Sequence, residues 1–255
     1  MPKISTWFRC NKLSLNLSKT NFIHFRNHSA LTNDLHFHIV IDGITIEKKE
    51  NTKFWGITID QCLSFNTHID NVVTSASRGI GILYRLKPYV SLKTLFTVYN
   101  AIILPYISYC NLIWASQKSK INPIFLLQKK AVRLCTDAAY LAHTEPLFRK
   151  LHTLPIFELH SYQIAIFMYR FHSSELPVTL NSMFQLNTSI HKYPTRTCTN
   201  VHLNNPKTAL AHRSIRHTGP DIWNSLPINI RSSPTKFILK KRLKDYLLSC
   251  AAGAI

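Results

Sequence analysis

The sequence has little acidic charge, little glycine and no two adjacent aspartates. Only 12 Asp and Glu residues stand against 31 Lys and Arg residues, so the formal net charge is +19 at pH 7. This balance predicts attraction to phosphate backbones or anionic membrane surfaces and excludes basic partners. Glycine occurs at only 6 of 255 positions and hydrophobic residues make up 45% of the chain. The composition therefore excludes a disordered chain and predicts one or two domains with a sizeable core.

The chain also lacks long apolar runs. No run approaches the ~18 continuous apolar residues of a membrane-spanning helix, and the N-terminus lacks the charged-then-apolar order of a signal peptide. The most apolar stretch, residues 92–115, is interrupted by Lys93, Asn100 and Pro105. We therefore expect an intracellular protein, nuclear or cytoplasmic, that is neither secreted nor embedded in a membrane.

Closely spaced cysteines are absent as well. The six cysteines form no Cys-x-x-Cys pair and no Cys/His arrangement with the spacing of zinc ligands. We interpret them as reduced thiols and expect no metal ligands and no cofactor in this chain. The six positions are Cys10, Cys62, Cys110, Cys135, Cys198 and Cys250.

The period of the apolar pattern changes near residue 60, which predicts an α+β fold. β-branched and aromatic residues favour short strands over residues 20–25, 36–41, 44–47 and 53–59. Asp42-Gly43 is a strong hairpin signal because glycine adopts positive φ without steric cost. We expect these strands to form one small antiparallel sheet.

Helical spacing of apolar residues dominates the rest of the chain. A helix is predicted over residues 66–87, with His68 on its polar face, and a second should start after an N-cap at Ser91 and be interrupted by Pro105. The terminal helix should bury Phe237 together with leucines, and a turn is expected at Gly219-Pro220. Further helices are predicted over residues 121–136, 147–151, 155–170, 222–226 and 234–249. Residues 176–206 lose the periodicity, which indicates an extended linker.

Residues 7–25 contain a dense motif: a tryptophan followed by Asn-Lys-Leu-Ser-Leu-Asn-x-x-Lys-Thr and a strand ending in phenylalanine. This pattern resembles motif D of the polymerase palm in reverse transcriptases of non-LTR retrotransposons, the LINE-type elements similar to jockey and CR1. The residues that carry the resemblance are Trp7, Asn11, Lys12, Leu13, Ser14, Leu15, Asn16, Lys19, Thr20 and Phe25. In that family the lysine lies near the incoming nucleotide, so the resemblance implies that Lys19 is an accessory proton donor to the leaving pyrophosphate.

Three later segments extend the resemblance over nearly the whole chain. Phe54-Trp55-Gly56 resembles the family's primer grip, which has Leu at the middle position and leads into the thumb helices. Tyr-x-Thr-Arg at residues 193–196 and Gly-Pro-x-x-Trp-Asn-x-Leu-Pro at residues 219–227 resemble motifs downstream of the thumb. The implied domains are a palm remnant over residues 1–60, a thumb-like region over 61–175, the linker over 176–206 and a basic helical region over 207–255.

The resemblance also implies what the chain does not carry. Polymerases of this family hold two Mg²⁺ ions on paired carboxylates that precede the tryptophan of motif D, and no Asp-Asp occurs in this sequence. We therefore expect a truncated fragment of an RNA-directed DNA polymerase that is inactive alone. Its partners would be RNA or an RNA/DNA primer-template, and the missing N-terminal polymerase portion. The alternatives are a stand-alone basic helical protein that binds nucleic acid and a helical interaction module whose charge is incidental.

Basic side chains on the polar faces of three predicted helices are the candidates for contact with phosphates. The first two groups come from the thumb-like region and the third from the terminal helix. They are Arg78 and Arg85; Lys129, Lys130 and Arg133; and Lys240, Lys241, Arg242 and Lys244.

Overall fold

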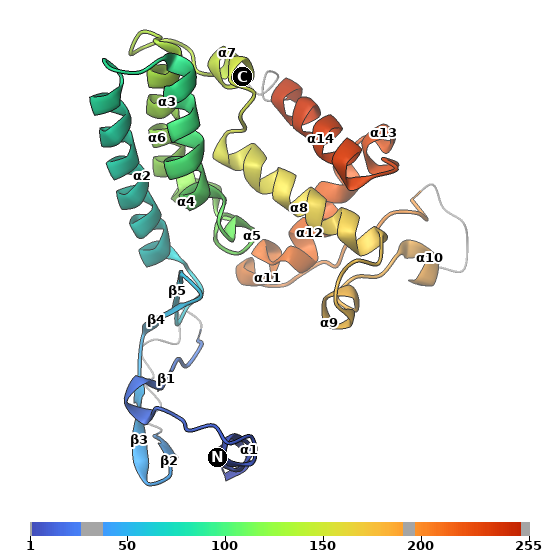
Figure 1. Ribbon diagram of the computed structural model, residues 1–255. Helices are drawn as coiled ribbons and strands as arrows, with labels where there is room; N and C mark the ends of the chain where they lie inside the picture. The colour runs from blue at the N-terminus through green and yellow to red at the C-terminus, as the bar shows by residue number, and fades with distance from the viewer. Residues whose placement is uncertain (1, 27–37, 191–196, 251–255) are drawn as a thin grey trace. The chain divides into compact units, whose positions relative to one another are not determined.

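The computed structural model describes residues 2–26, 38–190 and 197–250, which fall into two compact units, Met1–Asp70 and Asn71–Ile255. The predicted α+β class is confirmed: short strands lie near the N-terminus and helices make up the rest of the chain (Figure 1). Residues 193–196 and the start of the strand expected over residues 36–41 lie outside the described residues.

The first unit contains short elements with tight connections. These are α1 (Pro2–Cys10), a 3₁₀ turn η1 (Leu17–Lys19), β1 (Asn21–Phe22), β2 (Ile39–Ile41), β3 (Ile44–Lys48), β4 (Asn51–Phe54) and β5 (Ile57–Asp60). Asp42 and Gly43 have φ angles of 50° and 80° and connect β2 to β3, so the predicted hairpin is confirmed. The strands form two sheets instead of the expected single one, and β1 pairs with β3 in parallel.

The segment expected as one strand over residues 53–59 is a second hairpin. Phe54 pairs with Ile57 across a two-residue turn in which Trp55 and Gly56 have φ angles of 47° and 84°. Positive φ at both turn residues matches the right-handed twist of the flanking strands. The continuous-strand prediction was wrong because Gly56 supplies a turn, although the alternation of β-branched residues on each side is that of a strand.

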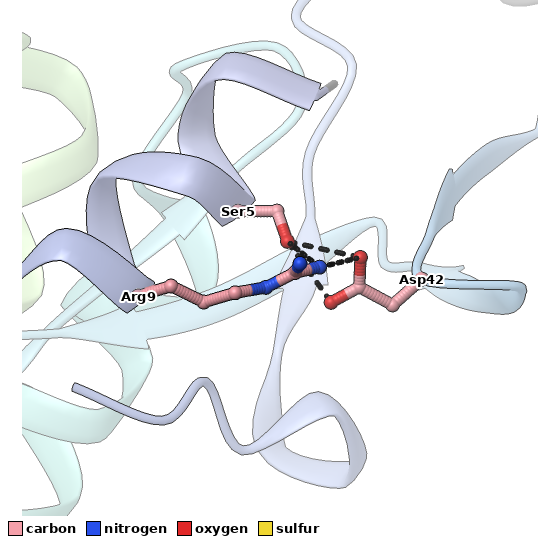
Figure 2. Close-up of polar contacts among 3 residues, drawn as sticks. All are labelled: Ser5, Arg9 and Asp42. Atoms are coloured by element: carbon pink, nitrogen blue, oxygen red, sulfur yellow. Dashed lines mark hydrogen bonds and ion pairs between the residues drawn. The ribbon is translucent and has the colours of Figure 1, made fainter. Parts of the chain in front are cut away.

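A polar cluster fastens α1 to the β2–β3 turn (Figure 2). Ser5 Oγ donates to the Asp42 carboxylate at 2.9 Å from both oxygens, and the Arg9 guanidinium donates to Asp42 Oδ1 at 3.1 Å. Arg9 also donates to Ser5 Oγ at 3.2 Å. The three side chains therefore satisfy one another, and the buried Ser5 hydroxyl is not left without a partner.

The helices that follow begin with α2 (Asn66–Leu86), which confirms the helix predicted over residues 66–87. The middle of its predicted apolar face is buried. His68 is buried too, and its Nδ1 accepts from the Thr58 backbone N–H at 3.4 Å. The buried apolar residues of α2 are Ile69, Val72, Ala76, Ile80 and Leu83. The remaining elements are α3 (Leu92–Val98), a π-helical segment η3 (Tyr99–Ile103), α4 (Leu104–Ser108), α5 (Asn111–Trp114), α6 (Lys118–Thr136), α7 (Glu145–Lys150), α8 (Ile156–His172), α9 (Val178–Asn181), α10 (Asn187–Ile190), α11 (Ala209–Arg213), α12 (Ile215–Ser225), α13 (Ile228–Arg231) and α14 (Lys236–Cys250).

The second predicted helix starts and changes where the sequence indicates. Ser91 caps α3 by accepting from the Thr94 N–H at 3.2 Å. The π-helical segment η3 ends two residues before Pro105, whose ring lacks an N–H and would clash with the carbonyl four residues earlier in a regular helix. Gly79 of α2 lets this segment come close, since a Cβ there would lie 2.6 Å from Ile103 Cγ1.

The C-terminal core forms where α8 packs against α12 and α14 (Figure 1). Gly219 and Pro220 lie inside α12, so the expected turn was wrong. The glycine serves packing instead, since a Cβ at Gly219 would lie 2.7 Å from Met168 Sδ of α8. Phe237 was expected to be buried but is 78% exposed, and Leu239 is buried in its place. Leu239, Leu243 and Leu247 follow one another at intervals of four residues, so they share one buried face of α14.

The segment expected as an extended linker over residues 176–206 packs onto this core in its described part. It contains α9 and α10, and an isolated bridge joins Leu186 to Val201. Phe184 and Val201 are buried in the core, where the Asn224 side chain of α12 exchanges two hydrogen bonds with the Val201 backbone. Isolated anchors separated by polar residues have no helical or strand period, so the pattern does not indicate their burial.

A buried histidine lies between α5 and α8. His160 is 9% exposed, and its Nδ1–H donates to the Asn111 carbonyl at 3.1 Å. Burial lowers the pKa of His160 to about 4, from an ordinary value of 6.5. The folded protein therefore holds this imidazole neutral at pH values at which an unfolded chain protonates it.

We expect this histidine to make the fold sensitive to acid. Between pH 6.5 and about 4 the unfolded state binds the extra proton, so stability falls as the pH falls, by about 2 kcal/mol at pH 5. His160→Asn keeps a donor for the Asn111 carbonyl but cannot titrate. Urea unfolding at pH 7.5 and pH 5 should show a smaller loss for the variant, and equal losses would contradict the prediction.

Candidate nucleic-acid interface

Lys19 lies at the end of a tight polar turn in the first unit. The Asn16 side chain accepts from the Lys19 N–H at 3.2 Å and from Ser18 Oγ at 2.7 Å, and Thr20 Oγ1 donates to the Asn16 carbonyl at 2.8 Å. These bonds explain the asparagine and the threonine at these spacings, since the Asn16 side chain caps the turn and the Thr20 hydroxyl closes it. The bond at residue 19 comes from the backbone and does not require a lysine. The Lys19 side chain is exposed, which is compatible with contact to a phosphate.

The three residues that resemble a primer grip form the tip of the β4–β5 hairpin. The rings of Phe54 and Trp55 stack with centroids 5.6 Å apart and planes inclined by 10°. They are 58% and 81% exposed. The hairpin therefore presents a flat aromatic pair, on an element separate from the sheet that follows the Lys19 turn.

Helices α2 and α6 form a groove of about 410 Å³ in the second unit. Helix α6 contributes Lys130 and Arg133 to its lining, and α2 contributes Tyr84, with Lys87 directly after the helix. Tyr140, in the loop after α6, completes the wall. The groove thus combines three cations with two tyrosines.

Ion pairing and hydrogen bonding fix the geometry at one end of this groove. Lys87 Nζ lies 2.6 Å from Asp137 Oδ1, and this contact lowers the pKa of the Asp137 carboxyl. Asp137 adopts a left-handed conformation that ends α6. Arg133 Nε donates to the Ala142 carbonyl at 3.0 Å, so the loop that carries Tyr140 is held at both ends.

The predicted basic residues of this region divide between different surfaces. Lys130 and Arg133 share the groove, and Arg78 and Arg85 are exposed on α2 without lining it. Lys129 lies elsewhere: its Nζ is 4.4 Å from the centre of the Phe125 ring, and it lines a separate cavity. Only two of the three cations predicted on α6 therefore line the α2–α6 groove.

The basic cluster of the terminal helix is a separate surface on α14. Lys240, Lys241 and Arg242 are exposed, and Arg242 donates to the Asn229 carbonyl at 2.9 Å. Lys244 is half-buried, and this burial lowers its pKa. Lys244 is thus less suited to contact a phosphate than its three neighbours.

Sequence reasoning missed three groove residues, namely Tyr84, Lys87 and Tyr140. Tyr84 follows Ser77 by seven residues on α2, so helical spacing places both on the face that lines the groove. Lys87 and Tyr140 lie outside the helices, where periodicity carries no information. A basic residue at a predicted helix C-terminus was the available signal for Lys87.

The carboxylates of the described chain do not assemble the magnesium site that the resemblance implies for a polymerase. Asp42 is held by Ser5 and Arg9, and Asp60 accepts from the backbone N–H groups of Cys62, Ser64 and Phe65. Among residues 2–26, 38–190 and 197–250, no three His, Cys, Asp or Glu side chains gather to hold a metal ion. No step of metal-assisted chemistry is assigned to these residues.

In the same described residues no helix has the length and apolar character needed to cross a bilayer.

Comparison with curated proteins finds distant, partial similarity to reverse transcriptases of non-LTR retrotransposons. The chain is 25% identical over 160 residues to the probable RNA-directed DNA polymerase from transposon X-element of Drosophila melanogaster. The aligned residues cover 61% of this chain and 17% of that protein. It is 30% identical over 122 residues to the probable RNA-directed DNA polymerase from transposon BS, covering 46% of this chain and 14% of that protein. A third relative, the RNA-directed DNA polymerase from mobile element jockey, is 26% identical over 117 residues, which cover 44% of this chain and 13% of the relative.

The chain thus spans less than a fifth of the length of these relatives. No family model matches it. No solved structure matches it significantly. The predicted resemblance to jockey-like elements is confirmed at this level.

Proposed function

We propose that the chain is a transposable-element-derived part of an RNA-directed DNA polymerase and contributes binding of an RNA or RNA/DNA primer-template. The observation that carries the proposal is the convergence of Lys87, Lys130 and Arg133 on one groove between α2 and α6. The similarity to three retrotransposon polymerases supports a nucleic acid as the partner. Lysine and arginine bind phosphate without reading sequence, so recognition should be weakly sequence-dependent.

The first unit would contribute to the same task through two features. Lys19, at the end of its asparagine-capped turn, would act as the accessory proton donor, and Phe54-Trp55-Gly56 would contact the primer strand. Both roles require the N-terminal polymerase portion, which is the proposed protein partner. Magnesium would be held by that portion and not by the carboxylates of this chain.

A stand-alone basic nucleic-acid-binding protein is the second candidate. It is favoured by the exposed cations of α14, which lie on an element separate from the groove. In that case the α14 cluster and not the groove would dominate binding.

The proposal is tested by titrating a short RNA–DNA hybrid with the full chain at several salt concentrations. Release of condensed counterions predicts a steep linear fall of log affinity with log salt, with a slope close to the number of phosphates contacted. The slope should be the same for unrelated hybrid sequences. A flat salt dependence would contradict the proposal.

We expect the purified chain to show no primer extension with Mg²⁺ or Mn²⁺, because no Asp-Asp pair occurs in its sequence.

The effect of Lys19→Ala should be measurable only in a fusion with an intact polymerase palm, where the substitution should slow turnover by roughly 10²-fold or more. Lys12→Ala, an exposed lysine of the same motif outside the capped turn, is the matched control. Chelator-sensitive incorporation by the chain alone, or unchanged turnover of the Lys19 variant in the fusion, would contradict these expectations.

A further inference from the structure

We propose that the α2–α6 groove binds unpaired bases of a single-stranded nucleic acid, with Tyr84 and Tyr140 as stacking surfaces. This inference rests on the proposed function and narrows it, because it names the form of nucleic acid that the groove accepts. A groove for duplex backbone alone needs cations, whereas this one also carries two aromatic side chains.

Both tyrosines that line the groove are exposed. Tyr84 is 60% exposed and Tyr140 is 74% exposed, although burial of such a ring on folding would stabilise the protein. They come from different elements, a helix and a loop, and line the same groove. Exposed rings next to lysine and arginine are the combination that binds single strands, because bases stack on the rings and phosphates meet the cations.

The charges of the groove favour an anionic chain over any other planar ligand. Lys130 is exposed on α6, one turn from Arg133, and both line the groove together with Lys87. Of these three cations, Lys87 forms an ion pair with Asp137. Phosphates on both sides of a stacked base would therefore meet a positive surface.

Both walls are fixed before a ligand arrives. Tyr84 lies on a regular helix, and the loop of Tyr140 is tied by the Lys87–Asp137 ion pair and by the bond from Arg133 to the Ala142 carbonyl. A wall that is already ordered costs little conformational entropy on binding, so more of the stacking energy appears as affinity.

Stacking on a tyrosine requires a base whose face is free. In a duplex each base is covered by its neighbours, whereas bases of single strands and loops can turn outward onto an aromatic side chain. The groove volume of about 410 Å³ lies within the range of pockets that take small planar ligands. The site should therefore prefer unpaired nucleotides over a hybrid of the same length, although the hybrid carries about twice as many phosphates.

The test measures the affinity of the full chain for a 12-nucleotide single-stranded RNA, the corresponding DNA, an RNA–DNA hybrid and an abasic strand that keeps the phosphates. Single strands should bind roughly tenfold or more tightly than the abasic strand, and Tyr84→Leu with Tyr140→Leu should remove that preference. Phenylalanine at both positions should restore it, because stacking needs the ring and not the hydroxyl. Tyr106→Leu, an equally simple change of a 49% exposed tyrosine on α4, is the control.

The outcomes separate this inference from the proposed function. If the abasic strand binds as tightly as the two single strands and the hybrid binds at least as tightly, with steep salt dependence, the chain binds phosphates and the stacking site is refuted. If the leucine variants retain the preference for single strands, these tyrosines are not the stacking surface and the inference also fails. If no ligand binds in a salt-dependent manner, the proposed function itself fails.

Discussion

Replacing both Lys130 and Arg133 with glutamate is expected to lower the affinity for an RNA–DNA hybrid by roughly tenfold to a hundredfold at moderate salt. Both side chains line the α2–α6 groove, and each lost phosphate contact should reduce the slope of log affinity against log salt by about one unit. The double variant should therefore show a slope smaller by about two. Fluorescence anisotropy with a labelled hybrid over a salt series measures both quantities.

Lys240→Glu with Lys241→Glu is the matched control, because it changes the net charge by the same amount on the exposed surface of α14. A larger effect of this pair than of the groove pair would favour the stand-alone binding protein. Arg133 also holds the Ala142 carbonyl, so Lys130→Glu alone, at an exposed position, separates lost binding from a displaced loop. If neither pair changes the slope, the charge is a solvated surface and the groove is not an interface.

Trp223→Ala is expected to destabilise the C-terminal core by about 3–5 kcal/mol. Trp223 is 2% exposed within the core of α8, α12 and α14, and its ring stacks on His172 with centroids 5.0 Å apart. Removing the indole leaves a cavity that the neighbouring leucines fill only partly. The free energy of unfolding from a urea titration measures the loss.

Phe237→Ala is the control for this experiment, since it also removes an aromatic ring but at a position that is 78% exposed. Its expected cost is within about 0.5 kcal/mol. A large loss for Phe237→Ala would restore the sequence-based expectation that this ring is buried. A small loss for Trp223→Ala would show that the tryptophan is not a packing anchor.

Features that depend on local chemistry were predictable from the sequence. The hairpin at Asp42-Gly43, the N-cap at Ser91 and the disturbance before Pro105 each follow from one or two residues whose conformational limits are known. The long helix α2 was predictable because its apolar residues keep a helical period over more than five turns.

Features that depend on distant partners were not predictable. The sequence pattern at Gly219-Pro220 predicts a turn, but the glycine is there because the Met168 sulfur leaves no room for a Cβ at position 219. The described part of residues 176–206 is ordered by single anchors, such as Phe184, that meet the core without a repeating pattern. In both cases the information lies in a residue far along the chain.

The candidate site was predictable in part for the same reason. A run of lysine and arginine on α6 indicates a basic face, but it does not show that Lys129 turns toward Phe125 while Lys130 and Arg133 line the groove. Tyr140 and Lys87 join that groove through tertiary contacts outside the helices. The functional roles of Lys19 and of the Phe54–Gly56 tip stay predictions.

The two-residue turn of the β4–β5 hairpin restricts how this segment can change in evolution. Side chains alternate between the faces of a strand, so one residue inserted at Trp55-Gly56 would shift the pairing of β5 and turn buried Ile57 outward. Substitutions that keep positive φ at the turn leave the register intact. Related sequences should therefore keep the length of this turn and a residue that tolerates positive φ, such as glycine, at position 56, and deletions or insertions should accumulate elsewhere.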